Sequence, residues 1–323
     1  MVDSTVSPIA RPLLAELPTI VTAHRAALGA EWKAFSHKVE DLGFTTLFVP
    51  DHLGDQLAPV PALTAAAEAT TDLRVGVLVA CNDFRHPAVY AKELATLDVL
   101  SGGRAEWGIG AGWLASEYEA AGLPFDPGPV RVDRMQEAVA VMKALLGDGV
   151  VMHEGRHYTV TNLDGRPKPV QRPHPPLLIG GARKRMLCFA GREADIVGVA
   201  PAPSADRSGT SGGGGEAPVS AADRQLGWLR DAAGDRFGDL EINMVAFPVF
   251  VTNNREQRAA KLADRMSLAP SAVLMAPHVW IGTVAQICDA LEERRQRWGV
   301  SYWVVPASAL DAVALVAARL AGR

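Results

Sequence analysis

RVGVLVACNDFRHP at residues 74–87 and LSGGRAEWGIGAGW at residues 100–113 decide the fold of this chain. Each segment contains a short, dense apolar run, Val75 to Ala80 and Ala105 to Ile109, of the kind found in strands buried on both faces. Between the runs, residues 87–100 begin with a proline that can open a helix and continue with leucines at helical spacing. The stretch predicts a strand, a crossover helix and a parallel strand, a unit in which ligands bind at the carboxyl ends of the strands.

The same alternation of strand and helix recurs along the chain. Nearly every expected strand is followed by a helical pattern, and eight such units close most economically into an α/β fold of the (β/α)8 TIM-barrel type. A doubly wound open sheet is the alternative. The expected strands lie at 17–23, 45–49, 75–80, 105–109, 177–179, 196–200, 242–251 and 301–305. The expected helices lie at 32–42, 61–70, 87–100, 130–146, 184–190, 226–237, 255–266, 284–298 and 309–320.

We expect one domain, residues 1–323, with two insertions. A length of 323 residues is common for a single parallel barrel. Residues 150–176 indicate an excursion with hairpin character that ends in a proline-rich linker. Residues 204–219 contain four consecutive glycines and indicate a flexible insertion rather than a domain boundary.

Charge and cysteine content exclude several classes of function. The net charge is −4, the pI is about 6.1 and no basic run occurs, which argues against nucleic acid as a partner. The three cysteines lie far apart without metal-binding spacing, so a reducing cytoplasmic location without disulfides is expected. The first residues lack a signal-peptide pattern, and no segment approaches the length of a membrane span.

Two glycine-rich turns that follow expected strands are candidates for cofactor binding. Gly110 to Ala115 matches a relaxed G-x-G-x-x-A pattern, but a dinucleotide fingerprint needs a further strand where residues 124–130 are rich in proline and glycine. A Rossmann site is therefore less favoured than the barrel. Gly110 and Gly112 let a planar cofactor approach the backbone, or they serve only a tight turn. For Gly108 the steric explanation is favoured.

The second turn, Gly180-Gly181-Ala182-Arg183-Lys184, lies between an expected strand and an expected helix. Backbone amides at a helix N-terminus bind phosphate, and the two cations that end the turn add charge. A solvated basic loop is the alternative.

Asp51 and His52 follow another expected strand. An imidazole at such a position can pass a proton to a substrate, and a carboxylate can accept hydrogen bonds from a ligand. A histidine that only caps or orients the following loop is the alternative. Because parallel strands share one carboxyl end, we expect Asp51, Cys81, Gly110 and Gly180 at the same end of the barrel.

Three motifs relate the chain to a known family. DFRHP at 83–87, LDVLSGGR at 97–104 and GIGAGW at 108–113 together resemble the bacterial luciferase-like flavin-dependent oxidoreductases. Within that superfamily the chain looks most like the branch that uses a 5-deazaflavin, coenzyme F420, and the resemblance extends from about Glu31 to the C-terminus. It implies a luciferase-like TIM barrel. A small-molecule substrate is expected as partner, and a homodimer is left open.

The resemblance also assigns residues to the cofactor. His52 is the candidate catalytic proton donor. A non-prolyl cis peptide is expected at Leu78-Val79, with Val77-Leu78 as the alternative, because the usual glycine before the valine is absent. Trp113 stands about where sugar-phosphate-oxidising relatives carry a carboxylate, which argues for an apolar wall. The cofactor contacts implied in this way are Asp51, His52, Leu78, Val79, Cys81, Gly110, Gly112 and Trp113, with Gly180, Gly181, Ala182 and Arg183 at its phosphate.

The sequence thus predicts an F420-dependent oxidoreductase that passes hydride between the deazaflavin and an organic substrate in an apolar pocket. An FMN-dependent monooxygenase that uses reduced flavin and oxygen is the nearest rival. A non-catalytic flavin-binding protein is the rival from another class. The F420 tail carries anionic groups beyond the phosphate, so Arg183, Lys184 and Arg185 are candidates for a cationic exit.

Overall fold

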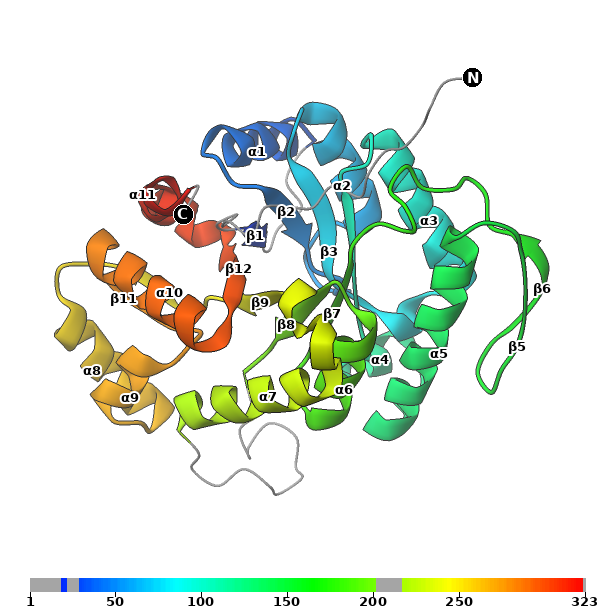
Figure 1. Ribbon diagram of the computed structural model, residues 1–323. Helices are drawn as coiled ribbons and strands as arrows, with labels where there is room; N and C mark the ends of the chain where they lie inside the picture. The colour runs from blue at the N-terminus through cyan, green and yellow to red at the C-terminus, as the bar shows by residue number, and fades with distance from the viewer. Residues whose placement is uncertain (1–18, 22–28, 202–216, 322–323) are drawn as a thin grey trace.

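Eight parallel strands form a ring at the centre of the structure (Figure 1). The computed structural model describes residues 19–21, 29–201 and 217–321. The strands follow the order β1-β12-β9-β8-β7-β4-β3-β2, and β1 pairs with both β12 and β2, which closes the barrel. They are β1 (Thr19–Val21), β2 (Thr46–Val49), β3 (Arg74–Cys81), β4 (Ala105–Gly110), β7 (Leu177–Gly181), β8 (Ile196–Val199), β9 (Glu241–Val245) and β12 (Val300–Pro306).

Helices surround this ring (Figure 1). The predicted α/β class with a parallel sheet is confirmed, since helices follow the strands along the chain. The α-helices are α1 (Gly29–Asp41), α2 (Pro59–Ala69), α3 (Pro87–Leu100), α4 (Ala115–Ala121), α5 (Gly128–Leu146), α6 (Lys184–Glu193), α7 (Pro218–Ala233), α8 (Arg255–Met266), α9 (Pro270–Met275), α10 (Val284–Trp298) and α11 (Leu310–Leu320). Short 3-10 turns are η1 (Asn82–Phe84), η3 (Gly234–Asp239) and η4 (Ala307–Ala309).

The barrel strands divide their side chains between two apolar layers. Leu47 and Val75 belong to the main core that includes residues of the surrounding helices, whereas Phe48, Leu178 and Val304 form a separate cluster inside the ring. Where both faces of a strand are buried, as in β2, β4 and β8, the strand appears in the sequence as a mainly apolar run. This is why such strands could be recognised from the sequence.

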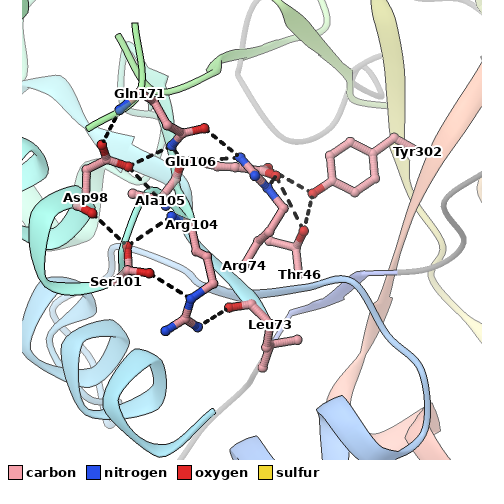
Figure 2. A network of polar contacts seen from close by, with 10 residues as sticks. All are labelled: Thr46, Leu73, Arg74, Asp98, Ser101, Arg104, Ala105, Glu106, Gln171 and Tyr302. Carbon is pink, nitrogen blue, oxygen red and sulfur yellow. Dashed lines mark hydrogen bonds and ion pairs between the residues drawn. The ribbon is translucent and has the colours of Figure 1, made fainter. Parts of the chain in front are cut away.

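Polar side chains fill the amino end of the barrel (Figure 2). Glu106 of β4 is only 2% exposed and accepts hydrogen bonds from Arg74 Nε at 2.6 Å and the Tyr302 hydroxyl at 2.9 Å. The Tyr302 hydroxyl also lies 3.0 Å from that of Thr46. A buried carboxylate is tolerated only with such partners, and this end of a parallel barrel serves stability.

The LDVLSGGR motif has a structural use at the same end (Figure 2). Asp98 accepts hydrogen bonds from the backbone amide of Gln171 at 2.9 Å and from its side-chain amide at 2.7 Å. Arg104 donates to the carbonyl oxygens of Leu73 and Ser101, both at 2.7 Å. Gly102 and its neighbour Gly103 adopt positive φ, 66° and 88°, and end helix α3.

A β-hairpin forms the first excursion from the barrel. β5 (Val150–Glu154) and β6 (Thr159–Asp164) pair antiparallel, which confirms the predicted hairpin, and they lie on the outer side of α5 (Figure 1). Glu137 of α5 accepts the backbone amides of His157 and Tyr158, at 3.1 and 2.8 Å. These bonds hold the hairpin turn against the helix.

The predicted strand 242–251 is wrong in one respect. The segment is divided into β9 and β10 (Val249–Val251), with a cis peptide between Phe247 and Pro248. β10 leaves the barrel and pairs in parallel with β11 (Trp280–Gly282) in a two-stranded sheet. Helices α8 and α9 lie between these two strands in the sequence and contribute to a small second core.

Two further boundaries differ from the prediction. The helix expected at 226–237 is α7, which already begins at Pro218, because proline is well accommodated in the first turn. The expected insertion 204–219 therefore ends too late, and its residues 204–216 lie outside the described residues. Helices α4 and α9 were not predicted, because seven and six residues carry too little periodicity. In the described part of the chain, no helix is long and apolar enough to cross a membrane.

Candidate active site at the carboxyl end of the barrel

The residues expected after the strands meet at one end of the barrel. The backbone amide of Cys81, at the end of β3, donates to the carboxylate of Asp51, which follows β2, at 2.9 Å. Cys81 also pairs with Gly110 of β4, and the side chain of Val79 reaches the position of Gly180 in β7. Asp51, Cys81, Gly110 and Gly180 therefore lie together at the carboxyl end, as predicted.

Strand β3 carries an irregularity at the predicted place. The peptide bond between Leu78 and Val79 is cis, and the pairing with β4 shifts register between Val77 and Ala80. The first of the two predicted positions is thus confirmed. Both side chains pack, half-buried, against the cluster inside the barrel.

Val79 lies over glycines of the two next strands, β4 and β7. A Cβ atom on Gly110 would stand 2.8 Å from Val79 Cγ2, and one on Gly180 would stand 3.4 Å from Cγ1. A Cβ atom on Gly108 would come within 2.1 Å of the carbonyl oxygen of Val77. Gly108 is therefore required sterically, in agreement with the favoured interpretation.

Glycines of three neighbouring strands, β4, β7 and β8, meet inside the carboxyl end, where the Val79 side chain packs against two of them. Gly198 of β8 extends this glycine face, since a Cβ atom there would lie 3.3 Å from Gly180 Cα and 3.4 Å from Leu178. A flat ring can lie close to a backbone only where no Cβ atom fills the space. The glycine face, defined as Gly110, Gly180 and Gly198, is thus the candidate wall for a flavin-type ring, with the Val79 side chain packed against part of it.

Gly112 has an explanation in packing. Its φ is 74°, and a Cβ atom would lie 2.0 Å from the Tyr118 hydroxyl and 3.0 Å from Cys81 Sγ. Both the backbone conformation and Tyr118 therefore require glycine. The contact of Gly112 with the cofactor stays a prediction.

Asp51 is an ion-pair partner. Its side chain is 4% exposed, and Arg85 donates to its two oxygens at 2.6 and 3.1 Å. Burial lowers the pKa of Arg85, but the bond to Asp51 outweighs burial and the pKa is raised. The paired carboxylate fixes the ends of β2 and β3, so a bond from Asp51 to a cofactor, which stays a prediction, would have to share these oxygens. His86 accepts the amide of Ala88 at 3.2 Å and caps α3.

His52 lies beside two residues of the segment that follows β4. Its Nδ1 is 3.1 and 3.0 Å from the carboxylate oxygens of Glu117. Its ring meets Trp113 edge-on, with centroids 6.0 Å apart and planes at 88°. Trp113 is 66% exposed and presents its indole at the barrel mouth. The structure thus places the predicted catalytic residue beside the predicted apolar wall.

Cys81 is a buried member of a polar chain. Its Sγ lies 3.1 Å from the Tyr118 hydroxyl, which donates to Asp83 at 3.0 Å. Arg134 of α5 donates to both oxygens of Asp83, at 2.8 and 3.0 Å. Burial raises the pKa of the Cys81 thiol, so it stays protonated and unreactive. Its contact with the cofactor stays a prediction.

The turn after β7 leads directly into α6. Arg183 occupies the N-cap position without a side-chain cap, so the first amides of α6 have no side-chain acceptor. Such amides bind anions. Gln225 holds the turn by donating to the carbonyl oxygen of Ala182 at 2.8 Å. A Cβ atom on Gly181 would lie 2.6 Å from Met186 Cβ, so this glycine also permits α6 to pack against β7.

The three basic residues of this turn do not act together. Arg183 and Lys184 are exposed, and within the described residues neither side chain forms an ion pair or hydrogen bond. Arg185 instead contacts the start of α5, where it pairs with Asp133 and donates to the carbonyl oxygen of Pro129 at 3.1 Å. Arg185 is therefore directed away from the predicted cationic exit.

Two site residues escaped the sequence reasoning. Arg131 of α5 donates to the carbonyl oxygen of Ala111 at 3.1 Å and stacks on Phe125, so it fixes the glycine turn after β4. Glu117 contacts His52 across 65 positions of sequence. No local pattern points to Arg131, whereas Glu117 could have been suspected from its place four residues after Trp113.

Comparison with known proteins identifies the family. The sequence profile described as luciferase-like monooxygenase matches residues 22–318, which is most of the chain. The chain belongs to the luciferase-like monooxygenase family. The resemblance inferred from the three motifs is thereby confirmed.

Two curated relatives of this luciferase-like protein depend on different cofactors. The FMNH2-dependent dimethylsulfone monooxygenase of Pseudomonas putida is 30% identical over 166 residues, covering 51% of this chain and 45% of the relative. The F420-dependent glucose-6-phosphate dehydrogenase of Microbacterium testaceum is 31% identical over 169 residues, covering 50% and 49%. The aligned part thus spans about half the length of these relatives.

Solved structures agree with the luciferase-like fold over nearly the whole chain. The coenzyme F420-dependent tetrahydromethanopterin reductase of Methanopyrus kandleri has a TM-score of 0.73 at 19% identity, covering 94% of this chain and 97% of that one. An F420-dependent secondary alcohol dehydrogenase has a TM-score of 0.71 at 18% identity, covering 94% and 98%. At such identities the likeness concerns the fold.

Proposed function

We propose that this protein is an oxidoreductase that uses coenzyme F420 and acts on an uncharged organic substrate. One observation carries the proposal: the glycine face and the uncapped N-terminus of α6 lie at the same end of the barrel, joined by the short turn at 181–183. A flat ring and a phosphate are the two parts that deazaflavins and flavins share.

Different residues of the site would contact the ring and the phosphate of the coenzyme. Gly110 and Gly180 would lie along the ring, with Leu78 and Val79 as its apolar neighbours. The turn at 180–183 and the amides of α6 would hold the phosphate.

His52 is the group that would move the proton. A bound deazaflavin supplies hydride transfer, in which two electrons and one hydrogen nucleus move between the ring and a substrate carbon. An alcohol–carbonyl conversion also moves one proton at the substrate oxygen, so both hydrogens are accounted for. His52 stands at the mouth with one ring nitrogen bound to Glu117 and the other available for this proton.

The substrate side is apolar. Trp113 and Leu53, 66% and 53% exposed, lie beside His52 at the mouth of the barrel. Large apolar side chains exposed at a site favour apolar partners. We therefore propose an alcohol, aldehyde or ketone with an apolar body rather than a sugar phosphate.

The choice of F420 over FMN rests on Arg183 and Lys184. Both cations are exposed beside the phosphate turn, where the longer anionic tail of F420 would leave the barrel. Similarity to an F420-dependent glucose-6-phosphate dehydrogenase supports this choice. Similarity to an FMNH2-dependent monooxygenase makes an FMN-dependent monooxygenase the second candidate.

Calorimetric titration with F420 and with FMN tests the proposal. We expect F420 to bind more tightly, with a margin that shrinks as salt screens its tail. The double variant R183Q/K184Q should weaken F420 by about tenfold, or 1.4 kcal/mol, and FMN much less. R185Q is the matched control, because its guanidinium is held by Asp133, and it should leave both affinities unchanged.

Three results would change the assignment. FMN binding as tightly as F420 would favour the monooxygenase. Binding of either coenzyme without turnover, with F420 and secondary alcohols or with reduced FMN and oxygen, would favour a non-catalytic binder. An equal loss in R185Q would remove the argument from the two cations.

A further inference from the structure

Glu117 binds one side of the His52 ring. Its two oxygens lie 3.1 and 3.0 Å from His52 Nδ1, and the backbone amide of Leu53 donates to one of them at 3.0 Å. A carboxylate that accepts this hydrogen bond favours the tautomer with the proton on Nδ1. The Glu117 side chain is 14% exposed, which shields this bond from competing water.

The second ring nitrogen, Nε2, has a different environment. The His52 side chain is 32% exposed, and no described residue forms a hydrogen bond with Nε2. Trp113 packs against the ring edge-on and restricts its rotation. With Nδ1 protonated, a neutral imidazole keeps its lone pair on Nε2, which can take up a proton and later return it.

We propose that Glu117 is a positioning residue that selects the Nδ1-protonated tautomer of His52 and thereby makes Nε2 the atom that exchanges the substrate proton. The inference rests on the proposed function and deepens it. Glu117 acts through His52, as a hydrogen bond to one imidazole nitrogen decides which form the other presents.

A merely structural role for Glu117 has to be separated from this one. The carboxylate also joins the segment after β4 to the turn after β2 through Leu53, so its removal affects stability in either case. Stability is therefore not the deciding measurement. The deciding measurement is the tautomer of His52, because a purely structural contact does not require a particular ring nitrogen to be protonated.

The deciding experiment is long-range proton–nitrogen NMR of the coenzyme-free protein, with the ring of His52 assigned through H52Q. We expect Nδ1–H with an unprotonated Nε2 in the wild type. In E117Q the side-chain amide can donate to Nδ1, so this preference should be lost. E119Q, on the exposed side of α4, is the matched control and should keep the wild-type tautomer.

Rates provide the second readout. With F420 and a responding secondary alcohol, E117Q should lower kcat at least about tenfold while the coenzyme affinity stays within twofold. E117A serves as a second variant if E117Q folds poorly, and it should show the same pattern.

The outcomes separate the two proposals. If the wild type binds neither F420 nor FMN, the proposed function fails, and the tautomer still decides the role of Glu117. An Nε2–H tautomer in the wild type, or an E117Q protein with unchanged tautomer and unchanged kcat, would overturn the inference about Glu117 while leaving the coenzyme assignment standing.

Discussion

The variant G180A tests whether the coenzyme ring lies on the glycine face. The added methyl group would stand 3.4 Å from Val79 Cγ1, an ordinary contact, and Gly180 is absent from the glycines with positive φ. Replacing such a glycine by alanine stabilises a protein by about 0.4–1 kcal/mol through the unfolded chain. We therefore expect unfolding stability equal to or slightly above that of the wild type.

Coenzyme binding should respond in the opposite direction. The methyl group of G180A occupies space that a ring on this face requires, and overpacking costs about 1–3 kcal/mol, or about fivefold to a hundredfold in affinity. Calorimetry with F420 and FMN measures this loss, and chemical denaturation measures stability. G227A, whose methyl group meets nothing within 4 Å, controls for glycine replacement itself.

Two results bear on the reasoning. A stable G180A protein with coenzyme affinity within twofold of the wild type would refute a ring on the glycine face. G108A shows what a true steric conflict looks like: its methyl group would meet the carbonyl oxygen of Val77 at 2.1 Å, so it should lose stability rather than affinity alone.

Four further variants test the scaffold. Burial lowers the pKa of His278 from 6.5 to about 4, so between these pH values the unfolded chain binds a proton that the folded chain does not. The free energy of unfolding should therefore fall by about 3 kcal/mol as the pH drops from 6.5 to 4. Denaturation of H278Q at several pH values should lack this loss. Burial raises the pKa of Glu40, but hydrogen bonds from the backbone amides of Asp72, Leu73 and Thr71 outweigh burial and lower the pKa below 4.5. The stabilisation that Glu40 provides should therefore be present above pH 4.5 and vanish as the pH falls. A loss of unfolding free energy in E40Q that persists in acid would contradict this. E106Q removes the negative charge that pairs with Arg74 and should cost about 2–4 kcal/mol in chemical denaturation, whereas Y302F should cost only about half as much.

The barrel and the place of its site were predictable from local patterns. Apolar runs such as Val75 to Ala80 are continuous because a central parallel strand has no face exposed to solvent. Each such run therefore predicts the position of one strand. Once the strands are parallel, residues that follow them, such as Asp51 and Gly110, must gather at one end. Topology therefore places the candidate site without any knowledge of side-chain contacts.

The contacts within the site were not predictable, because they depend on packing between distant segments. Glu117 stands on α4, a helix of seven residues, and meets His52 only because β2, β3 and β4 lie side by side in the barrel. Arg185 follows Arg183 by two positions, yet the nearby start of α5 offers it Asp133 as a partner. The orientation of a basic side chain at the start of a helix depends on tertiary contacts, which the periodicity of the sequence does not reveal.

The polar side chains that fill the amino end of the barrel affect the order in which coenzyme and substrate can bind. Thr46, Glu106 and Tyr302 are at most 4% exposed, so small molecules have no route through this end between the strands that carry them. A coenzyme ring on the glycine face and a substrate at Trp113 would then both have to enter from the carboxyl end of the barrel. If both ligands enter from this end and the coenzyme lies deeper, we expect the coenzyme to bind first and leave last, and an excess of substrate to slow its exchange.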